Sequence, residues 1–166
     1  MELLVLRHAI AFPHDAKRWP DDTLRPLTAK GMKRGRQAAA GIRRIARRPD
    51  RVLTSPLIRA LDTAKLFAQA ARWPEAVECA ALAPGRHPEE VLAALRREGA
   101  EAECVAVVGH QPHLGTLLAL CLRGEAQPQA LELRKSAIAC VWFDGPPRAG
   151  RGVLTALFPP RALRKL

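Results

Sequence analysis

Short apolar runs alternate with amphipathic stretches along most of the chain, a pattern typical of an α/β domain. Runs that are apolar at nearly every position indicate strands buried on both faces of a sheet. We predict strands at residues 2–6, 51–54, 77–79, 104–108, 137–143 and 153–158. Helices are predicted at residues 28–46, 55–71, 88–97 and 113–122. The alternation predicts one domain over residues 1–166, a three-layer α/β/α sandwich around a mainly parallel sheet with an antiparallel edge late in the chain.

Two of the predicted helices begin with residues that favour helix starts. Thr28 is suited to the N-cap of the first, because its hydroxyl can accept a hydrogen bond from a free backbone N–H. Ser55 followed by Pro56 predicts a cap with proline at the first helical position of the second. Residues 7–26 contain three prolines and no periodicity, so they are predicted to form a loop. The first helix is expected to bury Met32, Ala39, Ile42 and Ile45.

The length of 166 residues and the hydrophobic content of 48% suit a single globular domain with its own core. No apolar run is long enough to span a bilayer, and the run at residues 3–6 ends at Arg7 and His8, as in a strand rather than a secretory signal. We therefore expect a cytoplasmic protein without membrane contact. Its four widely spaced cysteines predict reduced, structural thiols and neither disulfides nor a zinc site.

The formal charge of +11 and the isoelectric point of about 10.7 favour anionic partners. Many of the basic residues lie between positions 30 and 51, where they would also suit a solvated helix face. Aromatic residues make up only 4% of the chain and tyrosine is absent, so the stacking platforms of single-strand nucleic-acid binders are missing. The charge by itself leaves nucleic acid, a membrane surface, a phosphorylated protein and small phosphates open as anionic partners.

Charged and polar side chains follow three of the predicted strands. Arg7 and His8 come directly after the first strand, Arg59 lies just beyond the second, and His110 follows the strand at residues 104–108. Because ligands of such sheets bind beyond the carboxyl ends of the strands, these four side chains are expected at one edge of the sheet.

Such a set of side chains is suited to phosphoryl transfer. A neutral imidazole is a competent nucleophile near pH 7, and guanidinium groups hold phosphate oxygens bidentately. A second histidine, when protonated, can donate to the equatorial oxygens of the transferring group. The chain shows no spacing of histidine or carboxylate residues typical of a metal site, so we expect neither a metal nor another cofactor.

Four short motifs, in order along residues 6–112, resemble those of the histidine phosphatase (phosphoglycerate-mutase-like) superfamily. They are Leu6-Arg7-His8-Ala9, with alanine in place of the usual glycine, Arg25-Pro26-Leu27-Thr28 followed by Gly31, Ser55-Pro56-Leu57-Ile58-Arg59-Ala60 followed by Thr63-Ala64, and Gly109-His110-Gln111-Pro112. The short chain, the R-P-L-T segment and the G-H-Q-P form are similar to the SixA-type phosphohistidine phosphatases of that superfamily. The resemblance implies a phosphoglycerate-mutase-like fold.

The resemblance also implies a role for each matching residue. His8 would be the nucleophile that takes phosphate as a covalent intermediate. Arg7, Arg59 and His110 would form the rest of the phosphate pocket. Weaker candidates for contact with phosphate or substrate are Arg25, His14 and Gln111.

Larger members of the superfamily carry a glutamate general acid between the second arginine and the second histidine. In that interval Glu89 and Glu90 are the candidates, but both fall in the first turn of a predicted helix, where carboxylates complement the helix dipole. A pocket without an acid suits phosphohistidine, because imidazole leaves with far less protonation than an alkoxide needs. The substrate would then be a phosphotransfer or signalling protein with an acidic surface, attracted by the basic charge.

Two other interpretations stay open. The same chemistry could act on a small phosphate ester, such as a sugar phosphate, a nucleotide or a cofactor precursor. Alternatively, a binding module with a vestigial pocket could use the charge of +11 to hold nucleic acid or another polyanion.

Overall fold

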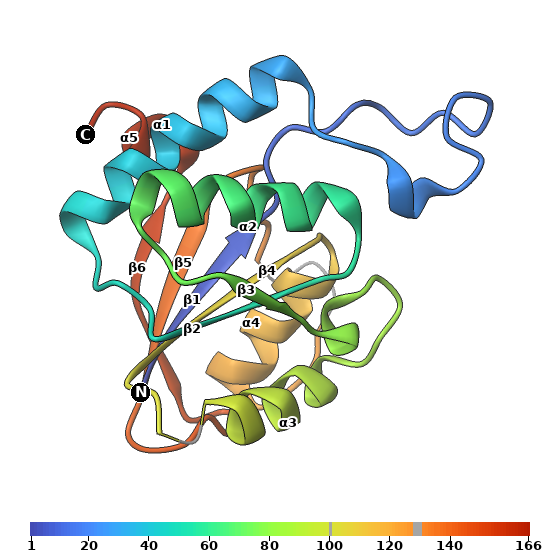
Figure 1. Ribbon diagram of the computed structural model, residues 1–166. Coiled ribbons are helices and arrows are strands. Elements are labelled where there is room, and N and C mark those ends of the chain that lie inside the picture. Colours follow the sequence, from blue (N-terminus) through green and yellow to red (C-terminus); the bar gives the residue numbers. More distant parts are fainter. Residues whose placement is uncertain (100, 128–130) are drawn as a thin grey trace.

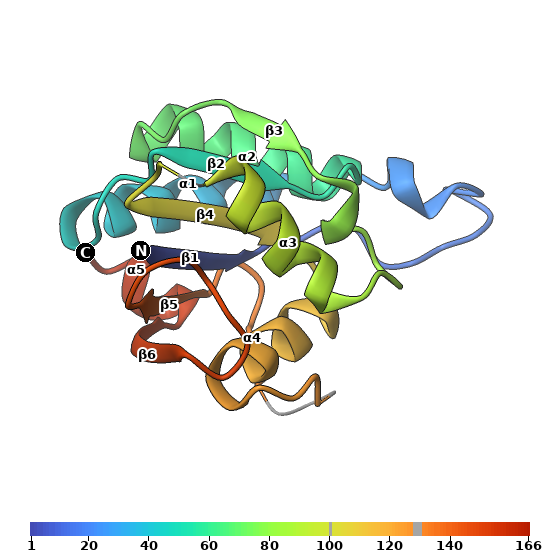
Figure 2. The same cartoon turned by 90° about the horizontal axis from the view of Figure 1, so that it is seen from below.

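The computed structural model describes residues 1–99, 101–127 and 131–166. Within these residues six strands form one sheet in the order β3-β2-β4-β1-β5-β6 (Figures 1 and 2). Strands β3, β2, β4 and β1 are parallel to one another, whereas β5 is antiparallel to both β1 and β6. The predicted antiparallel edge is therefore confirmed. The strands are β1 (Glu2–Arg7), β2 (Arg51–Thr54), β3 (Ala76–Glu78), β4 (Cys104–Gly109), β5 (Ile138–Phe143) and β6 (Gly152–Phe158).

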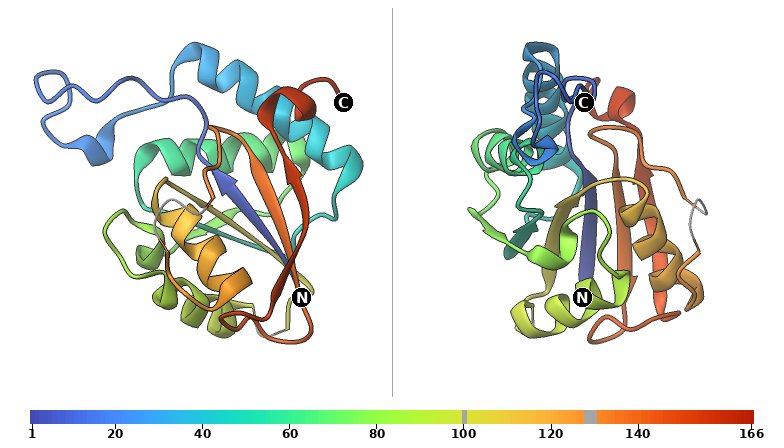
Figure 3. Two further views of the ribbon diagram at one scale, coloured as in Figure 1. Left: turned by 180° about the vertical axis from the view of Figure 1, so that it is seen from behind. Right: turned by 90° about the vertical axis from the view of Figure 1, so that its right-hand side faces the viewer.

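Helices cover both faces of this sheet (Figures 1 and 3). Helices α1 (Ala29–Ile45), α2 (Ile58–Ala71) and α5 (Pro160–Leu163) pack on one face, and α3 (Pro88–Glu98) and α4 (His113–Arg123) pack on the other. Two short 3-10 helices, η1 (Asp22–Leu24) and η2 (Ala80–Leu82), lie in loops. The predicted three-layer α/β/α sandwich is confirmed. Among the helices described, none combines the length and the apolar character needed to cross a membrane.

The central strands β1 and β4 are buried on both faces, as their continuous apolar sequences predict. Leu3 and Val5 pack with α3 and α4, whereas Leu4 and Leu6 pack with α1 and α2. Burial of each such side chain contributes about 1.5–3 kcal/mol to folding. The carboxyl ends of these two strands are thus fixed to the buried centre of the sheet.

Helix α1 begins where the sequence predicts but buries a different set of side chains. Thr28 is its N-cap, and Thr28 Oγ1 accepts a hydrogen bond from the Gly31 N–H at 2.9 Å. Met32 and Ile45 are 38% and 42% exposed, so the prediction that they are buried was wrong. The buried positions of α1 are Gly31, Gly35, Ala38, Ala39, Gly41 and Ile42.

Close backbone packing explains why α1 buries small residues. A Cβ atom at Gly31 would collide with the carbonyl oxygen of Ile10, and one at Gly41 would collide with that of Leu163. Leu163 belongs to α5, which the sequence did not predict because four residues are too few to show a helical period.

Helix α2 starts later than the sequence predicts. Its first residue is Ile58 and its N-cap is Leu57, without a side-chain cap bond, so the predicted Ser55 cap and Pro56 start were wrong. The Ser55 hydroxyl instead lies 2.8 Å from His110 Nε2. Ser55 therefore makes a tertiary contact with His110 in place of the helix-capping bond that the local sequence predicts.

Candidate active site

The carboxyl ends of β1 and β4 bring the two motif histidines together. The parallel register pairs Arg7 with Gly109, so His8 and His110 each lie one residue beyond that pair. Their ring centroids are 5.1 Å apart and the rings are inclined at 51°. Both are buried, with 6% and 3% of their surface exposed.

The hydrogen bond of His8 determines which ring nitrogen is free to react. Nδ1 lies 2.7 Å from the Ala9 carbonyl oxygen, which can only accept, so Nδ1 carries the proton and Nε2 keeps its lone pair. Within the described residues no group hydrogen-bonds to Nε2. Burial lowers the pKa of His8 to about 3, and Arg59, Arg7 and Lys135 act in the same direction. His8 is therefore neutral at pH 7, as a nucleophile must be.

His110 is oriented by Ser55. Ser55 Oγ accepts from the Leu57 N–H at 3.4 Å and lies 2.8 Å from His110 Nε2, where the tautomer of the ring decides which group donates. When the Ser55 hydroxyl donates to Nε2, the imidazole proton is on Nδ1, a buried atom without a partner in the described part of the chain. Burial, followed by the charges of His8 and Arg59, lowers the pKa of His110 to about 2. His110 is therefore neutral at pH 7.

The two arginines of the motifs use their Nη atoms in contacts with the protein, whereas their Nε–H groups have no partner among the described residues. Arg7 Nη1 donates to the Leu133 carbonyl at 2.6 Å. Arg59 Nη1 donates to the Asp22 carbonyl at 2.8 Å, and Nη2 lies 3.1 Å from the Asp22 carboxylate. The Nε–H groups of both arginines are buried, and no described residue accepts from either.

Three buried donors are thus available at one edge of the sheet: Arg7 Nε, Arg59 Nε and His110 Nδ1. A buried donor left without a partner costs about 1–3 kcal/mol. A phosphoryl group offers several acceptor oxygens together with negative charge, which is the kind of partner that these donors lack. The arrangement is chemically suited to hold phosphate beside a neutral histidine.

Thr63 fixes the backbone next to His8 relative to helix α2. Thr63 Oγ1 accepts from the Ala9 N–H at 2.9 Å and donates to the Arg59 carbonyl at 2.7 Å. The side chain is fully buried. Thr63, from the third motif, therefore connects the backbone beside His8 to that of Arg59, a role that its spacing alone did not reveal.

Asp22, which sequence reasoning missed, organises the outer side of the site. Its carboxylate accepts from Arg25 Nε at 2.7 Å and lies 3.0 Å from His14 Nδ1. The hydrogen bond from Arg25 holds the pKa of Asp22 well below its usual range. Arg25 also donates to the Phe12 carbonyl, so it braces the loop that projects beyond β1 in Figure 1. His14 is 70% exposed and reaches the site only through Asp22.

The remaining weak candidates make other contacts. The amide of Gln111 donates to the Leu131 carbonyl at 2.9 Å and accepts from a backbone N–H of α4. Glu90 pairs with Arg86 on the surface, and that contact lowers the pKa of Glu90. Glu89 is exposed in the first turn of α3. These positions support the interpretation of both glutamates as helix-start residues.

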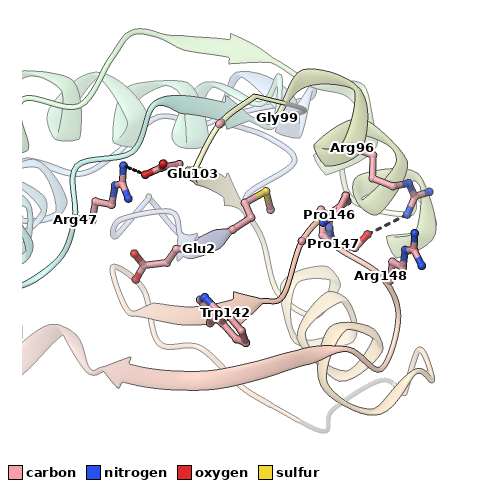
Figure 4. Close-up of a pocket in the computed structure, with 12 residues that line it drawn as sticks. Glu2, Arg47, Arg96, Gly99, Glu103, Trp142, Pro146, Pro147 and Arg148 are labelled. Carbon is pink, nitrogen blue, oxygen red and sulfur yellow. Dashed lines mark hydrogen bonds and ion pairs between the residues drawn. The ribbon is translucent and has the colours of Figure 1, made fainter.

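A cavity of about 690 Å³ lies at the opposite end of the sheet (Figure 4). Trp142 and Arg148 line it, together with Arg96, which donates to the Pro147 carbonyl at 3.2 Å. Arg47 is paired with Glu103 at its rim. No motif residue lines this cavity, so its size does not mark the predicted site.

Cysteine and metal chemistry receive no support from the geometry. All four cysteines are unbridged and buried, and burial raises the pKa of Cys104, Cys121 and Cys140 to about 12. Over residues 1–99, 101–127 and 131–166, no three histidine, cysteine or carboxylate side chains are grouped closely enough to hold a metal ion.

Comparison with known proteins gives a consistent relationship. The family model of the histidine phosphatase superfamily (branch 1) matches residues 3–84. An uncharacterized protein from Picosynechococcus sp. is 39% identical over 116 residues, which is 69% of each chain. The phosphohistidine phosphatase SixA of Escherichia coli is 29% identical over 171 residues, covering 99% of this chain and 97% of SixA.

Solved structures extend the likeness to the whole fold. The protein histidine phosphatase SixA complexed with tungstate has a TM-score of 0.84 at 29% identity, covering 98% of this chain and 99% of that one. The alpha-ribazole phosphatase from Shigella flexneri shares the fold, with a TM-score of 0.71 at 18% identity and coverage of 96% and 97%. Motifs, fold and relatives agree: the chain belongs to the histidine phosphatase superfamily and is a hydrolytic phosphatase.

Proposed function

We propose that this phosphatase removes phosphate from phosphohistidine on a phosphotransfer or signalling protein, through a covalent intermediate on His8. The observation that supports this proposal most is the neutral His8 ring with its free Nε2, at a site where the nearby Arg7 and Arg59 keep unsatisfied buried donors. The similarity to SixA, a phosphohistidine phosphatase by name, points to the same substrate class.

In the first step His8 Nε2 attacks phosphorus and the P–N bond of the substrate breaks. The departing imidazole takes up a proton from water. Arg7, Arg59 and the Nδ1–H of His110 hold the equatorial oxygens while the charge redistributes. In the second step water attacks phosphorus, the bond to Nε2 breaks, and inorganic phosphate leaves with the proton of the attacking water transferred to solvent. His8 regains its neutral form.

The carboxylates around the site favour a leaving group that needs little protonation. Within the described residues no aspartate or glutamate is buried. Asp22 is held ionised by Arg25, so it has no proton to donate at neutral pH. A general acid for an alkoxide must keep its proton near pH 7, which usually requires burial. Phosphohistidine avoids this requirement.

Glu132 gives specific support to a second candidate, a small-molecule phosphomonoesterase. Its carboxylate lies 3.8 Å from Arg7 Nη1, and it lines a cavity of about 500 Å³ together with Gln111 and Pro112. Its side chain is 81% exposed, which argues against a role as an acid. The binding module with a vestigial pocket has less support, because the chain is a phosphatase by family and every motif side chain is in place.

A substrate series tests the proposal. We expect phosphohistidine protein to be hydrolysed fastest, aryl phosphates more slowly and alkyl phosphates slowest, because the rate should follow the pKa of the leaving group. Brief reaction followed by mass spectrometry under alkaline conditions should locate phosphate on His8. The Glu132→Gln variant should keep this order. If alkyl esters react as fast as phosphohistidine, or if Glu132→Gln loses only its activity toward esters, the monoesterase is favoured instead.

A further inference from the structure

The segment Leu133–Ala137 is fastened to the reactive end of β1. The Ser136 N–H donates to the Arg7 carbonyl at 3.1 Å and to the His8 carbonyl at 3.3 Å. Arg7 in turn donates to this segment: its backbone N–H donates to the Ala137 carbonyl at 3.2 Å and its guanidinium donates to the Leu133 carbonyl. Ser136 adopts φ of 65°, a left-handed conformation uncommon for serine. Lys135 is therefore held between anchored neighbours, beside the predicted nucleophile.

Lys135 has no carboxylate partner among the described residues. The side chain is half-buried, and no described acidic residue forms an ion pair with it. Burial, and then the charges of Arg7, Arg25 and Arg59, lower the pKa of Lys135. In turn, the ammonium of Lys135 is one of the charges that lower the pKa of His8. The electrostatic neighbours of Lys135 are thus the groups of the phosphate site.

The charges at this edge are compensated unevenly. Asp22 neutralises part of the charge of Arg59 and Arg25, and Glu132 lies near Arg7. Lys135 has no corresponding anion in the part of the chain that the structure describes. An ammonium surrounded by like charges becomes favourable when an anion binds among them.

We propose that Lys135 is a further substrate-binding residue of this site, whose ammonium contacts an oxygen of the transferring phosphoryl group. The inference rests on the proposed function of the His8 site. A lysine is a compact point charge on a flexible stem with three donors, so it complements the fixed forks of Arg7 and Arg59. It can follow the phosphoryl oxygens as phosphorus moves from the leaving group toward His8 Nε2.

Substitution of Lys135 tests the proposal in two ways. We expect Lys135→Met to lower kcat/KM toward phosphohistidine protein by about tenfold or more, and Lys135→Arg to recover part of the loss. Arg134→Gln is the matched control: it removes one positive charge from the adjacent exposed position and should change kcat/KM less than about twofold. Without the ammonium, the pKa of His8 should rise, and the acid limb of the pH profile should move upward.

Binding of inorganic phosphate separates this inference from the proposed function. Titration calorimetry in the His8→Ala background should show phosphate affinity about tenfold weaker with Lys135→Met and unchanged with Arg134→Gln. This readout needs no turnover, so it decides the role of Lys135 even if phosphohistidine is not the substrate. Lys135→Gln replaces Lys135→Met if the latter does not fold. Equal phosphate affinity with and without the lysine, or equal losses for Lys135 and Arg134 variants, would overturn the inference.

Discussion

The two ends of the central sheet both carry arginines beside a hollow, but their polar groups are satisfied differently. At the amino ends of β1 and β4, Arg47, Arg96 and Arg148 are exposed, Arg47 is paired with Glu103, and Arg96 donates to a carbonyl (Figure 4). At the carboxyl ends, Arg7 and Arg59 keep buried Nε–H groups for which no described residue is a partner.

Cavity volume and motif residues therefore point to different ends of the sheet. The distal cavity of about 690 Å³ is ample for a ligand, yet its polar groups reach solvent or one another. At the candidate site, unsatisfied donors persist because the core fixes β1 and α2, which carry Arg7 and Arg59. Such donors cost stability until an anion binds, so they indicate function more directly than space does.

The largest expected effect on activity is that of His8→Ala, compared with a substitution at the opposite end of the sheet. His8→Ala should lower kcat/KM by at least about a thousandfold, roughly 4 kcal/mol, because the proposed covalent step needs the free Nε2 of this ring. Trp142→Ala at the distal cavity should stay within about twofold of wild type. Steady-state kinetics and phosphate labelling measure both. Near-normal activity of His8→Ala toward every phosphorylated substrate would disprove the covalent mechanism.

Acid should destabilise the protein through the buried histidines. The pKa values of His8 and His110 are lowered to about 3 and about 2, against an unfolded value of about 6.5. Below pH 6.5 the unfolded chain binds more protons than the native one. The free energy of unfolding therefore falls as the pH drops from 6.5 toward 3, by up to about 1.4 kcal/mol per pH unit for each histidine.

Thermal unfolding between pH 7 and pH 4.5 measures this dependence. The doubly substituted His8→Asn/His110→Asn protein should lose less Tm over that interval than wild type. His87→Asn, which changes an exposed histidine at the start of α3, should leave the wild-type slope. Equal slopes in all three proteins would show that the two buried rings do not control acid stability.

A smaller effect is expected from a charge-conserving change at Arg59. The guanidinium of Arg59 contacts Asp22 through its Nη atoms and keeps a free Nε–H, and a lysine ammonium cannot replace both. Arg59→Lys should therefore lower kcat/KM by at least about tenfold, roughly 1.4 kcal/mol. Arg96→Lys makes the same exchange at the distal end and should have no measurable effect. Wild-type kinetics in Arg59→Lys would remove this guanidinium from the phosphate site.

The smallest effect is expected at the start of α3. Glu89→Gln and Glu90→Gln should change kcat/KM by less than about twofold, because Glu90 is paired with Arg86 and Glu89 is exposed. The comparison should be made with both phosphohistidine protein and an alkyl phosphate. A selective loss of alkyl phosphatase activity in either variant would identify a general acid at this position.

Much of the fold and the core of the site could be predicted from the sequence. The apolar runs of β1, β2 and β4 identify central strands, and parallel strands align their carboxyl ends. Arg7, His8, Arg59 and His110 had to meet once those strands paired. Periodicity and turn chemistry are properties of neighbouring residues, and a single chain reveals them directly.

Only the tertiary structure decided how those side chains are held. Arg59 meets Asp22 across 37 positions, His110 meets Ser55 across 55, and Arg7 meets Leu133 across 126. Such partners depend on the paths of the loops and on close packing. The same packing brings Ser55 to His110 and leaves Met32 exposed. Local sequence does not determine these partners, because several groups could chemically serve as the partner of each side chain. The packing of the core decides which of them comes within reach.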